Sequence, residues 1–211
     1  LDRFDRRAAM AGERRELRNE WGVADDTPVV VTVGRLVAEK GFRELFEAHR
    51  RLRLSGSNHE LVVVGPTEAG KADQLTDAEV SEATDDGGRR VGFSDRPERY
   101  YAAADVFVLA SHREGFPRAA MEASAMGLPV IATRIRGCRQ VVDDGVTGLL
   151  VPVKDAAGLE SALRLLLNDP ARRHTMGAAA AQRARDRFDQ QYQIDLTLDT
   201  YRRLLPERAP S

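Results

Sequence analysis

The chain has 211 residues, and its hydrophobic share of 42% is enough for the buried core of one large domain, or of one domain with an appendage. Lysine and arginine number 32, aspartate and glutamate 33, and the basic residues are scattered, which argues against nucleic-acid binding and against recruitment to anionic membranes by overall charge. One cysteine, Cys138, excludes an internal disulfide framework and fits a reducing compartment, and the 4 histidines have no partners at metal-ligand spacing.

The beginning of the chain predicts a connector. Residues 1–18 are charged throughout and lack the apolar centre of a signal peptide, and the sequence contains no apolar run of about 18 residues that would span a bilayer. We expect a helix over 5–20 that enters from something upstream. The chain is therefore interpreted as a fragment of a longer protein.

Strand and helix patterns alternate along the rest of the chain. Short apolar and β-branched runs are typical of strands covered on both faces, and apolar residues at helical spacing indicate helices. In chain order we expect a strand at 29–33, a helix at 41–52, strands at 61–64 and 89–92, a helix at 95–103 with Ser94 as its N-cap, a strand at 105–110, a helix at 117–126, strands at 129–133 and 147–151, and helices at 155–168, 171–187 and 190–205. Residues 66–88 are weakly patterned and are expected to include a mobile loop that ends at 85–88. The alternation predicts a doubly wound parallel α/β sheet, Rossmann-like, with its ligand at the carboxyl ends of the strands.

Gly34, Arg35 and Lys40 lie where the first strand meets its helix. The amino terminus of a helix favours anions, and Gly34 permits close backbone approach. Arg35 offers a bidentate contact to phosphate oxygens, and Lys40 adds a compact charge. The alternative is a solvated turn with two surface cations.

A second phosphate-binding motif is rejected. Gly65 to Lys71 matches the P-loop skeleton of a glycine, four residues, a glycine and a lysine. However, Ala72 stands where Ser or Thr would hold magnesium, Pro66 lacks an N–H, and Glu68 would repel phosphate.

Two glutamates stand in unusual surroundings. Glu114 ends a predicted strand, so it shares the carboxyl edge of the sheet with Arg35, unless it is only a helix-start charge. Glu122 lies one to two turns into a helix of small residues, where an unpaired buried carboxylate would be costly. It is interpreted as a ligand contact, with a buried ion pair to an arginine as the alternative.

The order of motifs resembles glycosyltransferase family 4 over about residues 20–190. The resemblance rests on these segments: Gly34-Arg35 with Lys40, Val91-Gly-Phe93, Ala104-Asp-Val-Phe-Val-Leu-Ala-Ser111, Glu114-Gly-Phe-Pro117, Met121-Glu-Ala-Ser-Ala-Met-Gly-Leu-Pro-Val-Ile-Ala-Thr133 and Asp144-Gly-Val-Thr-Gly-Leu-Leu-Val-Pro152. The spacing of Glu114 and Glu122 resembles that family's Glu-x7-Glu motif. Members have two domains in the GT-B fold, and this chain resembles the carboxyl-terminal, nucleotide-sugar-binding half. The resemblance implies an interdomain connector over 1–27, a donor-binding domain over 28–188 and a C-terminal helix and tail over 189–211.

The resemblance also implies roles for individual residues. Arg35 and Lys40 would bind the donor diphosphate, Glu122 the ribose hydroxyls and Glu114 a hydroxyl of the donor sugar. The remaining implied donor contacts are Gly34, the backbone around Gly115, Phe116, Pro117 and Arg118, and the segment of Arg90 and Val91 beside the base. Arg35, Lys40 and Glu114 are the residues expected to take part in catalysis.

The implied reaction is retaining transfer of a sugar from a nucleoside diphosphate sugar, with a UDP-sugar favoured, to an acceptor hydroxyl. Two cations would stabilise the leaving diphosphate, so no metal or other cofactor is expected. The implied partners are the donor and the missing amino-terminal acceptor domain. The expected location is the cytoplasm, with peripheral association of the full-length enzyme at the inner face of the membrane.

One segment departs from the family pattern. Gln140 stands where members often carry Glu, and the segment Arg136-Gly-Cys138 resembles members that build polysaccharide or lipid-linked glycan chains. An alternative function of a different class is a non-catalytic, regulatory module that binds nucleotide sugars.

The P-loop alternative predicts magnesium-dependent hydrolysis of ATP or GTP that is lost in Lys71→Ala. We expect no hydrolysis by the unmodified chain, because the magnesium-binding hydroxyl is missing. A phosphate-release assay measures it, and hydrolysis that depends on Lys71 would restore the rejected motif.

Overall fold

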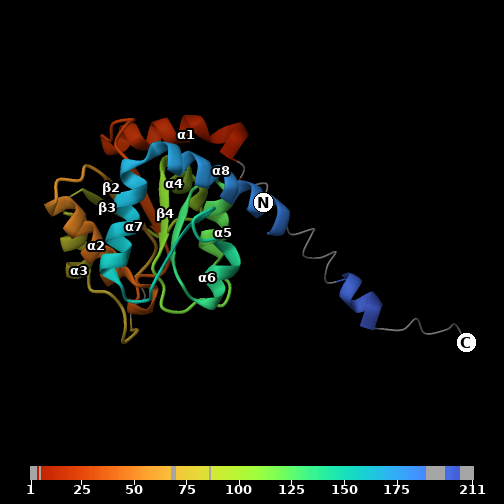
Figure 1. Ribbon diagram of the computed structural model, residues 1–211. Helices are drawn as coiled ribbons and strands as arrows, with labels where there is room; N and C mark the ends of the chain where they lie inside the picture. The colour runs from red at the N-terminus through yellow and green to blue at the C-terminus, as the bar shows by residue number, and fades with distance from the viewer. Residues whose placement is uncertain (1–3, 5, 68–69, 86, 189–197, 205–211) are drawn as a thin grey trace, which may run out of the picture.

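The computed structural model describes residues 4, 6–67, 70–85, 87–188 and 198–204. At its centre lies a 6-stranded sheet in the order β3-β2-β1-β4-β5-β6 (Figure 1). All neighbouring strands are parallel. The strands are β1 (Val29–Val33), β2 (Glu60–Val64), β3 (Gly88–Gly92), β4 (Val106–Leu109), β5 (Val130–Thr133) and β6 (Gly148–Val151). The predicted doubly wound parallel sheet is confirmed.

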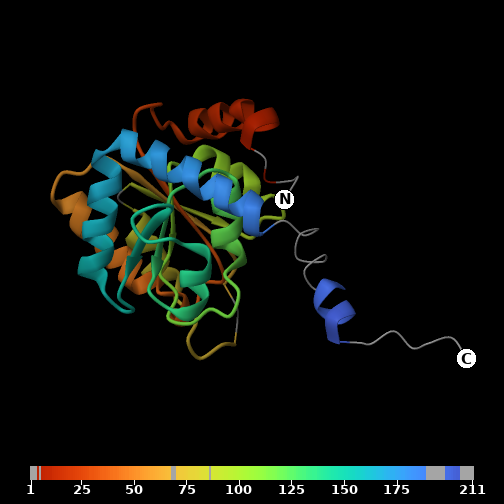
Figure 2. The ribbon, with the colours of Figure 1, turned by 45° about the vertical axis from the view of Figure 1, so that its right-hand side comes forward.

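Helices cover both faces of the sheet (Figure 2). The helices are α1 (Arg6–Trp21), the 3-10 helix η2 (Ala38–Lys40), α2 (Phe42–Leu54), α3 (Asp77–Thr84), α4 (Pro97–Ala103), α5 (Arg118–Ala125), α6 (Arg136–Val141), α7 (Ala156–Asn168) and α8 (Pro170–Arg187). Residues 198–204 are also helical, and the rest of the helix expected at 190–205 falls outside the described residues.

Two hydrophobic clusters, one on each face of the sheet, explain why the strands are continuous apolar runs in the sequence. Successive side chains of a strand point to opposite faces. Accordingly Val29 and Val31 pack under α1, α4, α5 and α6, whereas Val30 packs under α2, α3, α7 and α8. Since both faces are covered, neither could be polar.

Residues 66–88, which were expected to include a mobile loop, also contain a helix that the sequence did not predict, α3. Thr76 and Glu79 form a capping box that begins this helix. Hydrogen bonds from the Arg43 side chain and the Thr76 amide lower the pKa of the Glu79 carboxyl to about 2. The sequence signal was available as Thr, two residues and Glu, but only Val80 is buried in α3, so apolar periodicity did not reveal it.

The expected N-cap at Ser94 was also wrong. Helix α4 begins at Pro97, and Arg96 is its N-cap. Proline favours the first helical position because its fixed φ suits the helix and it lacks an N–H that would be unpaired there. The Ser94 hydroxyl instead accepts a hydrogen bond from the Arg96 amide at 3.1 Å, and Ser94 lies two residues before the N-cap position.

The order of strands places the switch point of the sheet between β1 and β4. These strands are neighbours, but β1 is followed by α2 on one face and β4 by α5 on the other. Ligands of doubly wound sheets bind at such a switch point, outside the carboxyl ends of the strands. The loops lie very close there, because a Cβ on Gly41, at φ 71, would overlap the Ala110 carbonyl.

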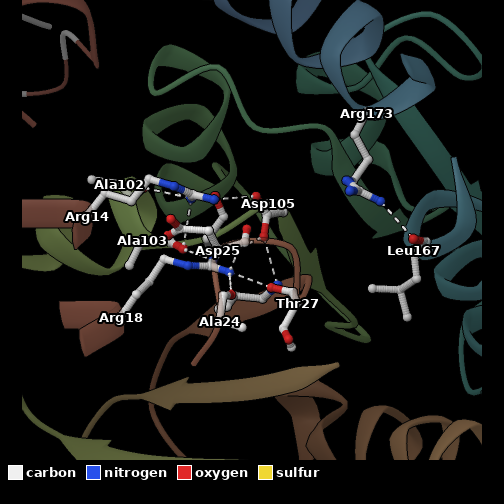
Figure 3. A network of polar contacts seen from close by, with 12 residues as sticks. Arg14, Arg18, Ala24, Asp25, Thr27, Ala102, Ala103, Asp105, Leu167 and Arg173 are labelled. Atoms are coloured by element: carbon white, nitrogen blue, oxygen red, sulfur yellow. Dashed lines mark hydrogen bonds and ion pairs between the residues drawn. The ribbon is translucent and has the colours of Figure 1, made fainter. Parts of the chain in front are cut away.

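The opposite, amino edge of the sheet carries the network drawn in Figure 3. The Arg18 side chain is 1% exposed and donates to the carbonyls of Ala24 and Thr27 as well as to Asp105. Arg14 donates to the other Asp105 oxygen at 2.9 Å, and the Val29 amide donates to Asp105 at 2.8 Å. Burial lowers the pKa of the Arg18 guanidinium, with Arg14 as a further cause. One carboxylate thus ties α1 to the starts of β1 and β4.

We predict that Asp105→Ala lowers the free energy of unfolding by about 3 kcal/mol or more, because the substitution leaves the buried Arg18 charge without its carboxylate. Asp77→Ala is the control, since the Asp77 side chain is 80% exposed and its ion pair with Arg90 lies in solvent. The control should lose less than about 1 kcal/mol. Urea denaturation measures both, and equal losses would contradict the role of Asp105.

Candidate active site

Lys40 and Glu114 meet across the crevice between β1 and β4. The Lys40 Nζ lies 2.6 Å from Glu114 Oε1, and the two side chains are 18% and 12% exposed. Lys40 ends the short helix after β1, whereas Glu114 lies in the loop after β4. The Ser111 hydroxyl donates to the same Glu114 oxygen at 2.7 Å. The carboxylate is therefore fixed in place by both loops.

Gly34 and Arg35 lie in the loop that leads from β1 to Lys40. The Gly34 amide donates to the Val64 carbonyl, which fixes this loop against β2. The Arg35 side chain is 41% exposed and approaches Glu39 at 3.9 Å. It is therefore an accessible cation on the same loop as Lys40.

In its described part, the loop after β2 lacks the helix that would follow a P-loop. Gly65 has no room for a Cβ, which would overlap the Gly34 carbonyl, and the Pro66 carbonyl accepts from the Leu36 amide. These contacts hold in place the loop after β1, which carries the candidate phosphate-binding residues Gly34, Arg35 and Lys40. No helix begins at Lys71, since α3 starts only at Asp77.

Glu122 lies in the second turn of α5 and is half-buried. Its Oε2 accepts a hydrogen bond from the hydroxyl of the fully buried Tyr101 at 3.1 Å. Burial, together with the Glu122 charge, raises the pKa of the Tyr101 phenol well above its usual value. The phenol therefore stays protonated and donates to the carboxylate. This tyrosine from α4 was not anticipated from the sequence, because the two residues are 21 positions apart.

The segment Gly115 to Arg118 forms the turn into α5. Gly115 and Phe116 are exposed, with the Phe116 side chain 62% exposed, whereas Pro117 is buried. The Arg118 amide donates to the Phe116 carbonyl at 2.9 Å. This amide, one of the backbone groups expected to face a sugar donor, therefore already has a hydrogen-bond partner. The start of α6 supports the turn, since a Cβ on Gly137 would overlap the Glu114 carbonyl.

Val91 is not brought together with these residues. It lies in β3, and β2 separates that strand from β1. Its side chain is partly buried and packs against the hydrophobic cluster on the α4 face. Any contact of this segment with a ligand would lie at the far end of the carboxyl edge.

His112 also holds the site, and the sequence did not reveal this role. The His112 amide donates to the Glu39 carbonyl at 2.7 Å, which joins the loops after β4 and β1. Its Nε2 lies 2.9 Å from Glu44 Oε1 on α2. No spacing rule connects residues 68 positions apart, so only the fold shows this contact.

In the described part of the chain, no group of three or more His, Cys, Asp and Glu side chains gathers in a way that could hold a metal ion. None of the described helices is long and apolar enough to cross a membrane.

Residues 13–183 match the family described as glycosyl transferases group 1. The chain belongs to this family. The resemblance found in the motifs is therefore confirmed at the level of a glycosyltransferase with a GT-B-like domain.

Individual relatives agree with this assignment. D-inositol 3-phosphate glycosyltransferase from Kineococcus radiotolerans is 38% identical over 218 residues, which cover 95% of this chain and 50% of that protein. Among solved structures, sucrose-phosphate synthase from Thermosynechococcus elongatus has a TM-score of 0.79 at 30% identity, covering 90% of this chain and 48% of the other. HepE from Anabaena, in complex with UDP and glucose, has a TM-score of 0.77 at 26% identity, with coverages of 90% and 52%. This glycosyltransferase chain thus spans about half the length of these relatives.

We predict that Cys138 does not react with thiol reagents in the folded protein. The residue is buried in α6, and burial raises the pKa of its thiol to about 11 from an ordinary value of 9.0. At pH 8 the reactive thiolate is therefore scarce and shielded. Labelling with a chromogenic disulfide reagent should be slow in buffer and rapid in denaturant. Rapid labelling of the native chain would show that α6 opens readily.

Proposed function

We propose that this chain is the donor-binding domain of a retaining glycosyltransferase of family 4, the carboxyl-terminal half of a GT-B enzyme. The observation that carries the proposal is the Lys40–Glu114 pair at the switch point of the sheet, with Arg35 exposed beside it. The pair combines a cation for phosphate with a carboxylate for hydroxyl groups. A nucleoside diphosphate sugar needs both.

The relatives support this assignment in two ways. HepE, which is similar to this chain, is described in complex with UDP and glucose, and that complex favours a UDP-sugar as the donor. The relatives are about twice as long as this chain, which leaves room for a separate acceptor domain. On this basis residues 1–27 form the interdomain connector, 28–188 the donor domain and 189–211 the C-terminal helix and tail.

Each proposed role follows from the chemistry of the donor. Arg35 and Lys40 stabilise the negative charge that develops on the leaving diphosphate, which makes a metal unnecessary. Glu122, oriented by the Tyr101 hydroxyl, accepts hydrogen bonds from two ribose hydroxyls. Glu114 orients a hydroxyl of the sugar while sharing Lys40 with the diphosphate. The turn from Gly115 to Arg118 closes over the phosphates, and Gly34 and Val91 complete the donor contacts.

The acceptor hydroxyl would be supplied by a growing polysaccharide or lipid-linked glycan. We place the full-length enzyme in the cytoplasm, at the inner face of the membrane where such glycans are made. A non-catalytic module that only binds nucleotide sugars is the second candidate. Gln140 favours this candidate, because members of the family often carry a charged Glu at this position, whereas Gln140 is neutral and lies exposed on α6.

We predict that the chain binds UDP in a calorimetric titration, and that Lys40→Ala weakens binding about tenfold to a hundredfold. The loss corresponds to a charge-assisted hydrogen bond of about 1.5–3 kcal/mol. Lys71→Ala is the matched control, because it removes the same charge from the rejected P-loop segment and should change the affinity less than about twofold. The donor assignment fails if UDP does not bind at millimolar concentration, or if both variants lose equally.

We also predict that the 211-residue chain alone transfers little or no sugar, because the acceptor half of the crevice is absent. Radiolabelled UDP-sugar incubated with the chain should give product only when the upstream domain is restored. Measurable transfer by the chain alone would contradict the proposal that a separate domain binds the acceptor. No turnover even in the restored enzyme would favour the non-catalytic module.

A further inference from the structure

Three arginines surround the turn that leads from Glu114 into α5. Arg113 precedes Glu114, and Arg118 is the first residue of α5. Arg136 is the first residue of α6, whose start packs directly against the turn through Gly137. We refer to Arg113, Arg118 and Arg136 as the basic rim.

The charges of the basic rim are largely unneutralised. Arg113 is 86% exposed, and its nearest acid, Glu39 at 3.6 Å, also approaches Arg35 at 3.9 Å. The side chains of Arg118 and Arg136 are exposed and make no hydrogen bond or ion pair with any residue in the described part of the chain. By contrast, Arg134 at the end of β5 is paired with Asp144 at 2.6 Å. Since the whole chain has a net charge of −1, the positive rim is a local feature.

The basic rim belongs to different elements from the proposed donor cations. Arg35 and Lys40 stand on the loop after β1, whereas the rim belongs to the loop after β4 and to the starts of α5 and α6. Arg113 lies closest to the donor cations, since Glu39 approaches both Arg113 and Arg35. One diphosphate satisfies Arg35 and Lys40. The exposed guanidinium groups of the rim match the fork geometry of a further phosphate.

We propose, resting on the proposed function, that the basic rim binds a phosphate or diphosphate group of the acceptor. The acceptor hydroxyl must lie beside the donor sugar, and hence beside Glu114. A phosphate on the same molecule then falls within reach of the rim. The exposed Phe116 ring, in the same turn, offers an apolar contact to the portion of the acceptor next to its phosphate. The acceptor class is thus a phosphorylated molecule rather than a neutral sugar.

The test is a titration of the chain with inorganic pyrophosphate while UDP saturates the donor site. Pyrophosphate should still bind, and Arg136→Glu should weaken that binding about tenfold, as expected for a lost charge-assisted contact. The same variant should change the affinity for UDP less than about twofold. Arg15→Glu is the matched control, because Arg15 is exposed on α1, at the opposite edge of the sheet (Figure 1), and should change neither affinity.

Each other outcome has a definite meaning. If pyrophosphate no longer binds once UDP is saturating, or if Arg15→Glu weakens it as much as Arg136→Glu, the basic rim is no site. Co-sedimentation with phosphatidylcholine vesicles, with and without phosphatidylglycerol, separates a membrane headgroup from an acceptor phosphate. Rim-dependent binding to the anionic vesicles alone would overturn the acceptor assignment. Rim-dependent binding of pyrophosphate without any binding of UDP would instead reject the donor proposal and keep the rim.

Discussion

The pairing of β1 with β4 is the constraint on which the crevice depends, and the Asp105 carboxylate fixes it at one end. Asp105 immediately precedes β4 and accepts a hydrogen bond from the first amide of β1. The two strands then run in parallel register, with Val30 opposite Val106, and emerge together at the carboxyl edge. Because strands rise by about 3.3 Å per residue, a few residues of fixed register set the separation of the loops beyond them. The contact at one edge therefore decides which side chains meet at the other.

At the carboxyl edge, opposite charges are held close in partly buried surroundings. An ion pair that is mostly shielded from water is screened less by salt than a surface pair. Lys40 and Glu114 also have well-defined anchors, since Ser111 donates to the same carboxylate oxygen. The pair is thus preorganised before any ligand arrives. Glu122 is also fixed before a ligand arrives, because its partner Tyr101 belongs to the hydrophobic cluster and cannot easily move.

The fold was largely predictable from the sequence, whereas the support of the site was not. Strands such as β1 are continuous β-branched runs because both faces are covered, so period and composition identify them. Helix α3 was missed because its signal is a capping box rather than an apolar stripe. Motif spacing predicted that Lys40 and Glu114 share an edge, but it gave no distance. The Tyr101–Glu122 and His112–Glu44 contacts join residues 21 and 68 positions apart that only the folded sheet brings together, so no local rule could find them.

The buried Arg18 has a consequence for how such enzymes can be recombined. Its guanidinium fills the space between α1, the residues before β1 and the end of α4. If a donor domain were exchanged between enzymes at a junction just before β1, a foreign helix would have to supply an arginine in the same place. A junction upstream of Arg14 carries the whole contact along. Natural or engineered chimeras should therefore tolerate joints ahead of α1 far better than joints at the start of the sheet.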